Sequence, residues 1–176
     1  MKIHLDQIID TVRKNLNSTN IILTGLEDHE KEVSSILHGV GLINTNTAKD
    51  IVVYGSCNIE NQKLLQAKKA KIDCYPVDTF KNKFLFNHYA KNALQGKTIL
   101  IDINLDYKLV MPIFLLNPKT VIWSNQINKK KAQKIDILIS NEQNLDNIKS
   151  GLTYWLSDVE FEHFSFDGKT IEPYKK

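Results

Sequence analysis

Short apolar runs alternate with helically spaced apolar residues in the first half of the chain, a pattern typical of α/β proteins. Residues 20–25 (NIILTG) and 50–55 (DIVVYG) are apolar runs, the second one β-branched, and each predicts a buried strand. Between them, residues 27–41 predict a helix that begins with acidic side chains and ends at glycines. Residues 42–43 predict a brief second strand, followed by a polar loop.

Residues 58–80 predict a helix, a strand and the start of another helix. The first helix has one apolar stripe, formed by Leu64, Leu65, Ala67 and Ala70. Its lysines fall mostly on the opposite, solvent-facing side. Residues 72–77 then predict a strand interrupted by Pro76, and the second helix opens at Asp78.

Residues 3–16 predict an amphipathic helix ahead of the first strand. Most of its apolar residues fall near one face, namely Ile3, Ile8, Val12 and Leu16. A polar break at residues 15–20 ends the helix. We expect it to pack on the domain or on a partner.

The pattern of the first half recurs about 80 residues later. Residues 136–140 (DILIS) match residues 50–54 (DIVVY). The other elements expected in this second unit are a first strand at 97–103, a shortened helix at 145–151 and, at 153–161, a counterpart of the strand and helix start at 72–80. Pro112 and Pro118 would shorten its first helix.

We therefore expect the chain to divide into four parts. These are an N-terminal helix at 1–18, a first unit at 19–90, a divergent second unit at 91–166 and a tail at 167–176. Residues 87–96 are the expected linker between the units. The tail is expected to form a small hairpin that turns at Asp167-Gly168, or to be disordered.

The order of elements from residue 19 to residue 86 resembles the BRCT domain family, whose members bind phosphoproteins and DNA ends. The likeness is to the BRCT domain that ends bacterial NAD-dependent DNA ligases, in which a lysine opens a short helix and a later strand leads to an aromatic residue. Here those positions hold Lys63, the pair Ala67-Lys68 and Phe80. Two features depart from the family pattern. Gly39-Val40-Gly41 stands for its adjacent glycines, and Phe80 stands for its usual tryptophan, as in the ligase branch.

This resemblance implies an α/β fold with two small BRCT-like units in tandem, each a short, mostly parallel sheet flanked by helices. It implies a non-catalytic scaffold that binds a phosphorylated protein or peptide in DNA repair, replication or checkpoint control. In phosphopeptide-binding members, phosphate is held by a strand-end hydroxyl, the next glycine N–H and a helix-opening lysine. The matching residues here are Thr24, Gly25 and Lys63. The second unit has Asn104 or Leu105 after its first strand and lacks an obvious lysine, so we expect it to serve packing or a partner groove.

Composition narrows the function classes. The 176 residues carry a net charge of +3, and Arg13 is the single arginine, so an extended sequence-reading DNA interface is not expected. No apolar run approaches the roughly 20 residues that span a bilayer, and the N-terminus lacks a signal-peptide core. Cys57 and Cys74 lack the spacing of a zinc site and suit a reducing compartment. We expect an intracellular protein, nuclear if eukaryotic, with no membrane partner.

Catalytic motifs are missing from the sequence: it contains no G-x-S-x-G, P-loop or G-x-G-x-x-G, and its histidines have no ligand-like spacing. We therefore expect no enzyme, no catalytic residue, no cofactor and no metal site. The cluster Lys129, Lys130, Lys131 and Lys134 is expected to be solvated, although it suits an acidic partner or DNA.

Three alternatives remain open. The same phosphate site would suit a DNA end with a 5′ phosphate, and such binding would weaken strongly with salt. The module would otherwise bind proteins without phosphate. The third alternative is a small doubly wound enzyme domain, in which Asp102 and Asp106 would serve at the strand ends.

Overall fold

The computed structural model describes residues 2–16, 19–26, 28–39, 49–55, 62–86 and 92–174. The chain forms two compact units. Residues 9–88 make the first, called here the N-terminal unit, and residues 1–8 together with 89–176 make the second, the C-terminal unit. The boundary falls within helix α1 (Leu5–Asn15). The predicted strand at residues 42–43, Cys57 and the first part of the expected linker, residues 87–91, lie outside the described residues.

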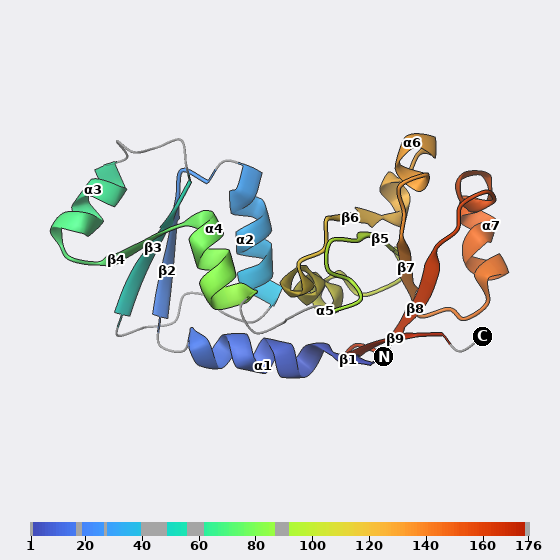
Figure 1. Cartoon of the computed structure of the whole chain (residues 1–176), viewed down its shortest axis with the longest axis horizontal. Helices are drawn as coiled ribbons and strands as arrows, with labels where there is room; N and C mark the ends of the chain where they lie inside the picture. The colour runs from blue at the N-terminus through green and yellow to red at the C-terminus, as the bar shows by residue number, and fades with distance from the viewer. Residues whose placement is uncertain are drawn as a thin grey trace. The chain divides into compact units, whose positions relative to one another are not determined.

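The N-terminal unit contains a three-stranded parallel sheet in the order β2-β3-β4. Its strands are β2 (Thr19–Thr24), β3 (Lys49–Tyr54) and β4 (Asp73–Pro76). Its helices are α2 (Asp28–Gly39), α3 (Gln62–Lys69) and α4 (Val77–Phe80), the last continued by the π-helical turn η1 (Lys81–Leu85). Ile51, Val52 and Val53 are all buried because helices cover both faces of the sheet, with α3 on one side and α2 on the other (Figure 1).

Helix α3 confirms half of its predicted apolar stripe. Leu64 and Ala67 are buried and pack with Val52. Leu65 is 45% exposed, and Ala70 is exposed as well. Residues 64 and 67 are three apart and share a face, whereas residue 65 is turned by about 100° from residue 64. The helix ends at Lys69, and the left-handed Lys71 (φ 56°) redirects the chain into β4.

The C-terminal unit contains a six-stranded sheet in the order β1-β9-β8-β7-β5-β6. Strands β5, β6, β7 and β8 run parallel, and β9 and β1 extend the sheet antiparallel. The strands are β1 (Ile3–His4), β5 (Thr98–Ile101), β6 (Thr120–Trp123), β7 (Ile137–Ser140), β8 (Glu162–Phe166) and β9 (Thr170–Pro173). The protein is thus an α/β protein with a mostly parallel sheet flanked by helices and a second, smaller parallel sheet.

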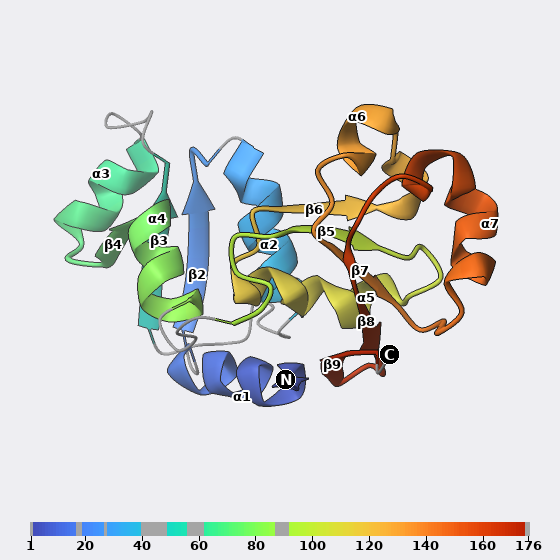
Figure 2. The same cartoon turned by 45° about the vertical axis from the view of Figure 1, so that its right-hand side comes forward.

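Helices lie on both faces of this larger sheet. They are α5 (Tyr107–Val110), the 3-10 segments η2 (Met111–Leu116) and η3 (Ser124–Gln126), α6 (Lys129–Ala132) and α7 (Leu145–Leu156). Both views place α5 on one side of the strands and α7 on the other (Figures 1 and 2). Pro112 stands near the start of η2, where the α-helical geometry of α5 gives way to the tighter 3-10 form. None of the helices in the described part of the chain has the length and apolar character needed to cross a membrane.

The two units share a three-strand pattern. Strands β5-β7-β8 are parallel neighbours, as are β2-β3-β4, and each set follows the order of the sequence. In each set, an aspartate at the start of the central strand accepts a hydrogen bond from the first part of the neighbouring strand. The Asp50 carboxylate accepts a hydrogen bond from Asn20 Nδ2 (3.0 Å), and the Asp136 carboxylate accepts one from the Thr98 N–H (2.8 Å). The matching runs in the sequence therefore occupy matching places in the two sheets.

The prediction that residues 153–161 contain the last strand of the second unit is wrong. Residues 153–156 belong to α7, which is longer than predicted, and the strand is β8, starting at Glu162. Ile148, Leu152 and Leu156 recur every four residues and pack on the cluster that contains Leu100 and Leu138. Packing of this helical stripe outweighs the strand preference of the aromatic residues near its end.

The segment set apart in the sequence as a tail forms a hairpin with β8. Strand β9 pairs with β8 and with β1, which places Ile3 opposite Ile171. The N-terminus therefore begins as a short strand where a helix was predicted, and α1 follows at Leu5. At the turn, Gly168 has a φ of 91°, and Asp167 Oδ1 accepts hydrogen bonds from the N–H groups of Lys169 and Thr170. These bonds hold the pKa of Asp167 below its usual value.

Replacing Asp167 by alanine is expected to lower the free energy of unfolding by about 1 kcal/mol, because the turn loses both side-chain hydrogen bonds. Asp167→Asn should lose less, since the amide oxygen can still accept. Urea unfolding at pH 7 followed by tryptophan fluorescence would measure both variants, because Trp123 and Trp155 lie in the C-terminal unit. Equal stability of Asp167→Ala and the wild type would show that the turn holds without its side chain.

Candidate functional site

The phosphate-site residues predicted in the N-terminal unit lie at the carboxyl edge of its sheet. Thr24 is the last residue of β2 and is buried, with 6% of its surface exposed. Gly25 follows in a left-handed conformation (φ 62°), which favours glycine. The Gly55 N–H donates to the Thr24 carbonyl oxygen (3.3 Å), so the chain segments that leave β2 and β3 are in contact.

Lys63 is the second residue of α3, and it is exposed. Helix α3 begins on the side of the sheet where β2 and β3 end (Figures 1 and 2). Residues 56–61, which lead from β3 to this helix, lie outside the described residues. The structure thus places a left-handed glycine turn and a lysine at a helix start on the same edge, with Thr24 beneath them in the strand.

The register of the sheets identifies the position that corresponds to Thr24 in the C-terminal unit. Ile21 pairs with Ile51, and Ile99 pairs with Ile137. Thr24 follows Ile21 by three residues, as Asp102 follows Ile99. An acidic residue therefore stands where the N-terminal unit has a hydroxyl, and Ile103 stands where it has Gly25.

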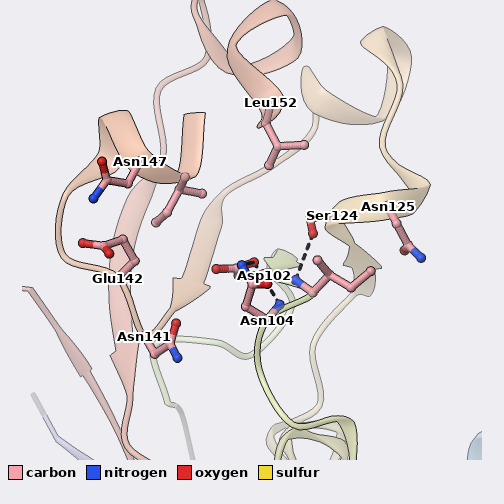
Figure 3. Close-up of a pocket in the computed structure, with 10 residues that line it drawn as sticks. Asp102, Asn104, Ser124, Asn125, Asn141, Glu142, Asn147 and Leu152 are labelled. Carbon is pink, nitrogen blue, oxygen red and sulfur yellow. Dashed lines mark hydrogen bonds between the residues drawn. The ribbon is translucent and has the colours of Figure 1, made fainter. Parts of the chain in front are cut away.

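A pocket of about 460 Å³ opens at this carboxyl edge of the larger sheet. It is formed by the segments that follow β5, β6 and β7 and by α7 (Figure 3). The lining residues are Asp102, Ile103, Asn104, Ser124, Asn125, Asn141, Glu142, Asn147, Ile148 and Leu152. These described lining residues comprise two carboxylates, four amides, a hydroxyl and three apolar side chains, with no lysine, arginine or histidine among them.

The pocket lies at the point where the strand connections diverge. From β5 the chain passes to β6 on one side, and from β7 it passes to β8 on the other. The connections that leave neighbouring β5 and β7 thus separate, and open α/β sheets bind ligands in the crevice formed at such a point. This location marks the pocket as a candidate binding site independently of any resemblance.

Hydrogen bonds fix the loops around Asp102. Its Oδ1 accepts from both the N–H and the side-chain amide of Asn104, each at 3.1 Å. Ser124 Oγ accepts from the Ile103 N–H at 2.9 Å, which ties the end of β5 to that of β6. Figure 3 shows Asp102 in the middle of the pocket, with Asn141 and Ser124 on opposite sides and Leu152 above. The pocket is therefore held in shape by contacts among its own residues.

The acidic pair suggested by the sequence is separated. Asp102 is 5% exposed and lines the pocket. Asp106 is exposed and caps α5, where its Oδ1 accepts from the Lys108 N–H at 2.9 Å. Within the described ranges, no group of three or more His, Cys, Asp or Glu side chains is placed to hold a metal ion.

A second polar cluster lies where β7 and β8 run side by side. Ser140 Oγ is 2.7 Å from His163 Nε2 and donates to the Glu142 carbonyl oxygen at 2.9 Å. The rings of Tyr174 and His163 pack together, with their centroids 4.3 Å apart. Burial lowers the pKa of His163 to about 4. Ser140 has none of its surface exposed, so its hydroxyl cannot reach a substrate. This cluster serves the fold rather than nucleophilic chemistry.

The lysine cluster lies on and just after α6, exposed as predicted. Lys131 Nζ donates to the Gln126 carbonyl oxygen at 2.9 Å, so one of its charges stabilises the loop before the helix.

The sequence did not identify the pocket, although it carried an indication of it. Asp102, Ser124 and Asn141 each follow a strand directly, which places polar groups at one edge of a parallel sheet. No family model, curated protein or solved structure matches the chain.

Proposed function

We propose that the chain is a non-catalytic binding module of the BRCT type, which captures a phosphorylated protein with Thr24, Gly25 and Lys63. The observation that carries this proposal is the left-handed turn at Gly25, on the edge of the sheet where the Lys63 helix begins. Such a turn lets a backbone N–H approach an anion closely, and a helix start adds partial positive charge. Lys63, exposed, supplies the full charge.

The shared pattern of the two sheets supports a tandem arrangement for this module. Strands β2-β3-β4 and β5-β7-β8 have the same order and direction, and Asp50 and Asp136 stand at corresponding positions, each accepting a hydrogen bond from the neighbouring strand. Gly25 corresponds to Ile103 in the C-terminal unit, and among the residues that the structure describes the lysine at a helix start on this edge belongs to the N-terminal unit, so that unit carries the phosphate. The resemblance places such a module in DNA repair, replication or checkpoint control.

Phosphopeptide binding by the full chain is expected to weaken about tenfold or more in Lys63→Ala, because one charge-assisted contact to phosphate is worth roughly 1.5–3 kcal/mol. Lys69→Ala is the matched control, since Lys69 is an exposed lysine in the last turn of the same helix. A phosphoserine and phosphothreonine peptide library supplies the ligand, and fluorescence anisotropy with its unphosphorylated copy measures the dependence on phosphate. Both variants should have the same melting temperature as the wild type.

Three results would contradict this proposal. Equal affinity for phosphorylated and unphosphorylated peptides would leave a phosphate-independent interaction module. Binding of a 5′-phosphorylated duplex alone, with strong salt dependence, would favour the DNA-end alternative. Equal losses in the Lys63 and Lys69 variants would show a general charge effect instead of a site.

A further inference from the structure

We propose that the pocket of the C-terminal unit binds the cationic group of an alkylammonium or guanidinium ligand, with Asp102 as its charge partner. This site is separate from the phosphate site proposed above, and it does not depend on it. The starting point is the place of Asp102: a carboxylate at the strand end that corresponds to Thr24, inside a pocket at the divergence of the strand connections.

The electrostatics of the pocket select positive charge. Asp102 is 5% exposed, and its carboxylate oxygen Oδ1 accepts hydrogen bonds from neutral donors of Asn104. Among the residues that the structure describes, Asp102 forms no ion pair with a lysine, arginine or histidine. A buried carboxylate without a cation loses hydration and gains little in return, so a cation supplied by a ligand completes the site. Among the lining residues that the structure describes, an anion would meet two carboxylates and no positive side chain.

The amide side chains add specificity. Asn141 and Asn125 are exposed lining residues whose side chains have no hydrogen-bond partner within the described part of the chain. Their oxygens can accept from the several N–H groups that an ammonium or guanidinium carries. Glu142 contributes less, because its Oε1 already accepts from the Asn144 N–H at 2.9 Å, and Figure 3 shows its carboxylate pointing away from Asp102.

The apolar wall identifies the kind of cation. Ile148 and Leu152 of α7 line the pocket together with the polar groups. A bare metal ion is surrounded by oxygens, whereas a lysine or arginine side chain carries a methylene stem that packs on apolar surface. The volume of about 460 Å³ falls within the range of roughly 300–1,000 Å³ that small-ligand pockets occupy. The two sources of this chemistry are a basic residue of a peptide and a free polyamine.

The test is a titration of the ¹⁵N-labelled full chain, followed by the amide resonances of Ile103, Asn104 and Asn141. The probes are N-acetyl-lysine-N-methylamide, its arginine counterpart, putrescine, the norleucine analogue that lacks the ammonium, MgCl₂ and sodium phosphate. The capped lysine is expected to bind with a Kd on the order of 1 mM. Asp102→Asn should weaken it at least tenfold, as expected for loss of a charge-assisted contact. Asp106→Asn is the matched control, because it removes the same charge four residues along, outside the pocket, and asparagine still caps α5.

Each outcome decides the proposal. Binding of the capped lysine or arginine, lost in Asp102→Asn and kept in Asp106→Asn, supports it and assigns a peptide source. Tighter binding of putrescine supports the same chemistry with a polyamine source. The proposal is overturned if norleucine binds as well as lysine, if only Mg²⁺ or phosphate shifts these amide resonances, or if no probe does.

Thermal melting of Asp102→Asn shows whether a lost response reflects unfolding. In that case Asn141→Ala, which changes an exposed side chain, should weaken capped lysine binding about twofold or more, and an unchanged Kd overturns the proposal. The phosphate test uses Lys63 in the other unit, so the two proposals can fail separately.

Discussion

Replacing Gly55 by alanine is expected to lower the free energy of unfolding by about 2–3 kcal/mol, the cost typical of forcing extra atoms into a packed site. A Cβ at this position would lie 2.0 Å from the carbonyl oxygen of Gly25 and 3.0 Å from its carbonyl carbon. Both are backbone atoms, so relief requires moving the chain rather than rotating a side chain. The hydrogen bond from the Gly55 N–H to the Thr24 carbonyl oxygen would be strained by the same movement.

Gly96→Ala separates this steric effect from backbone strain. Gly96 has a φ of 70°, and a Cβ there would meet nothing within 4 Å. Gly96→Ala should therefore lower the free energy of unfolding by about 1 kcal/mol, the cost of an alanine in the left-handed conformation. Circular dichroism melts would rank the variants, and hydrogen exchange of the β2 and β3 amides would show whether the damage in Gly55→Ala is local. If Gly55→Ala were no less stable than Gly96→Ala, the chain segments that follow β2 and β3 would not be in close contact at Gly25 and Gly55.

The Gly55 variant also bears on the proposed phosphate site. Straining the hydrogen bond from the Gly55 N–H to the Thr24 carbonyl oxygen would turn the peptide unit that also carries the Gly25 N–H, which is the group expected to approach the anion. A folded Gly55→Ala protein should therefore bind phosphopeptide more weakly, even though Gly55 itself lies outside the set Thr24, Gly25 and Lys63. Close packing between successive strand ends is thus what would shape the site.

The strands were predictable where the sequence has continuous apolar runs. Residues 51–53 and 137–140 are buried on both faces, and only a strand in a covered parallel sheet needs such a run. The helix α7 was not fully predicted, because residues 153–156 suit either a strand or the last turn of a helix. The spacing from Ile148 to Leu156 decides in favour of the helix once a cluster is available to receive it.

The pocket depends on information that spacing along the chain does not contain. Asp102, Ser124 and Asn141 are far apart in the sequence, and they meet only because β5 lies between β7 and β6. Likewise, Ile3–His4 is too short for a hydrophobic pattern, and it becomes a strand because β9 presents a partner. The order and pairing of strands arise from tertiary packing. The sequence could therefore predict polar residues after each strand, but it could not predict that these residues come together in one pocket.

Acidification is expected to destabilise the C-terminal unit through His163. Burial lowers the pKa of this histidine to about 4 in the folded protein, against 6.5 for the exposed side chain. Its Nε2 lies 2.7 Å from the buried hydroxyl of Ser140 and its ring packs against Tyr174, and this partial burial disfavours the charged imidazolium in the folded state. The unfolded chain releases the ring to water, where it gains a proton more readily.

The sign of the effect follows from proton uptake. Between pH 6.5 and pH 4 the unfolded state binds more protons than the folded state, so stability falls as the pH falls through this window. Above pH 7 the contribution of His163 is fully present. Without screening, the whole shift would correspond to about 3 kcal/mol; because the ring is only partly buried and solvent screens its charge, the loss expected by pH 5 is about 1 kcal/mol. Carboxylates such as Asp167, whose pKa is lowered, add their own loss at lower pH.

His163→Gln isolates the histidine, because glutamine can still bond to Ser140 but does not titrate. Urea unfolding at pH 8, 6.5 and 5 should show the wild type losing about 1 kcal/mol more than the variant between the first and last values. At pH 8 the wild type should be more stable than the variant, since its histidine ring packs on Tyr174. This difference in the free energy of unfolding should shrink or reverse on acidification. Parallel losses in the two proteins would mean that the imidazole remains hydrated in the folded state, and that the contact between β7 and β8 at Ser140 is looser than its 2.7 Å bond indicates.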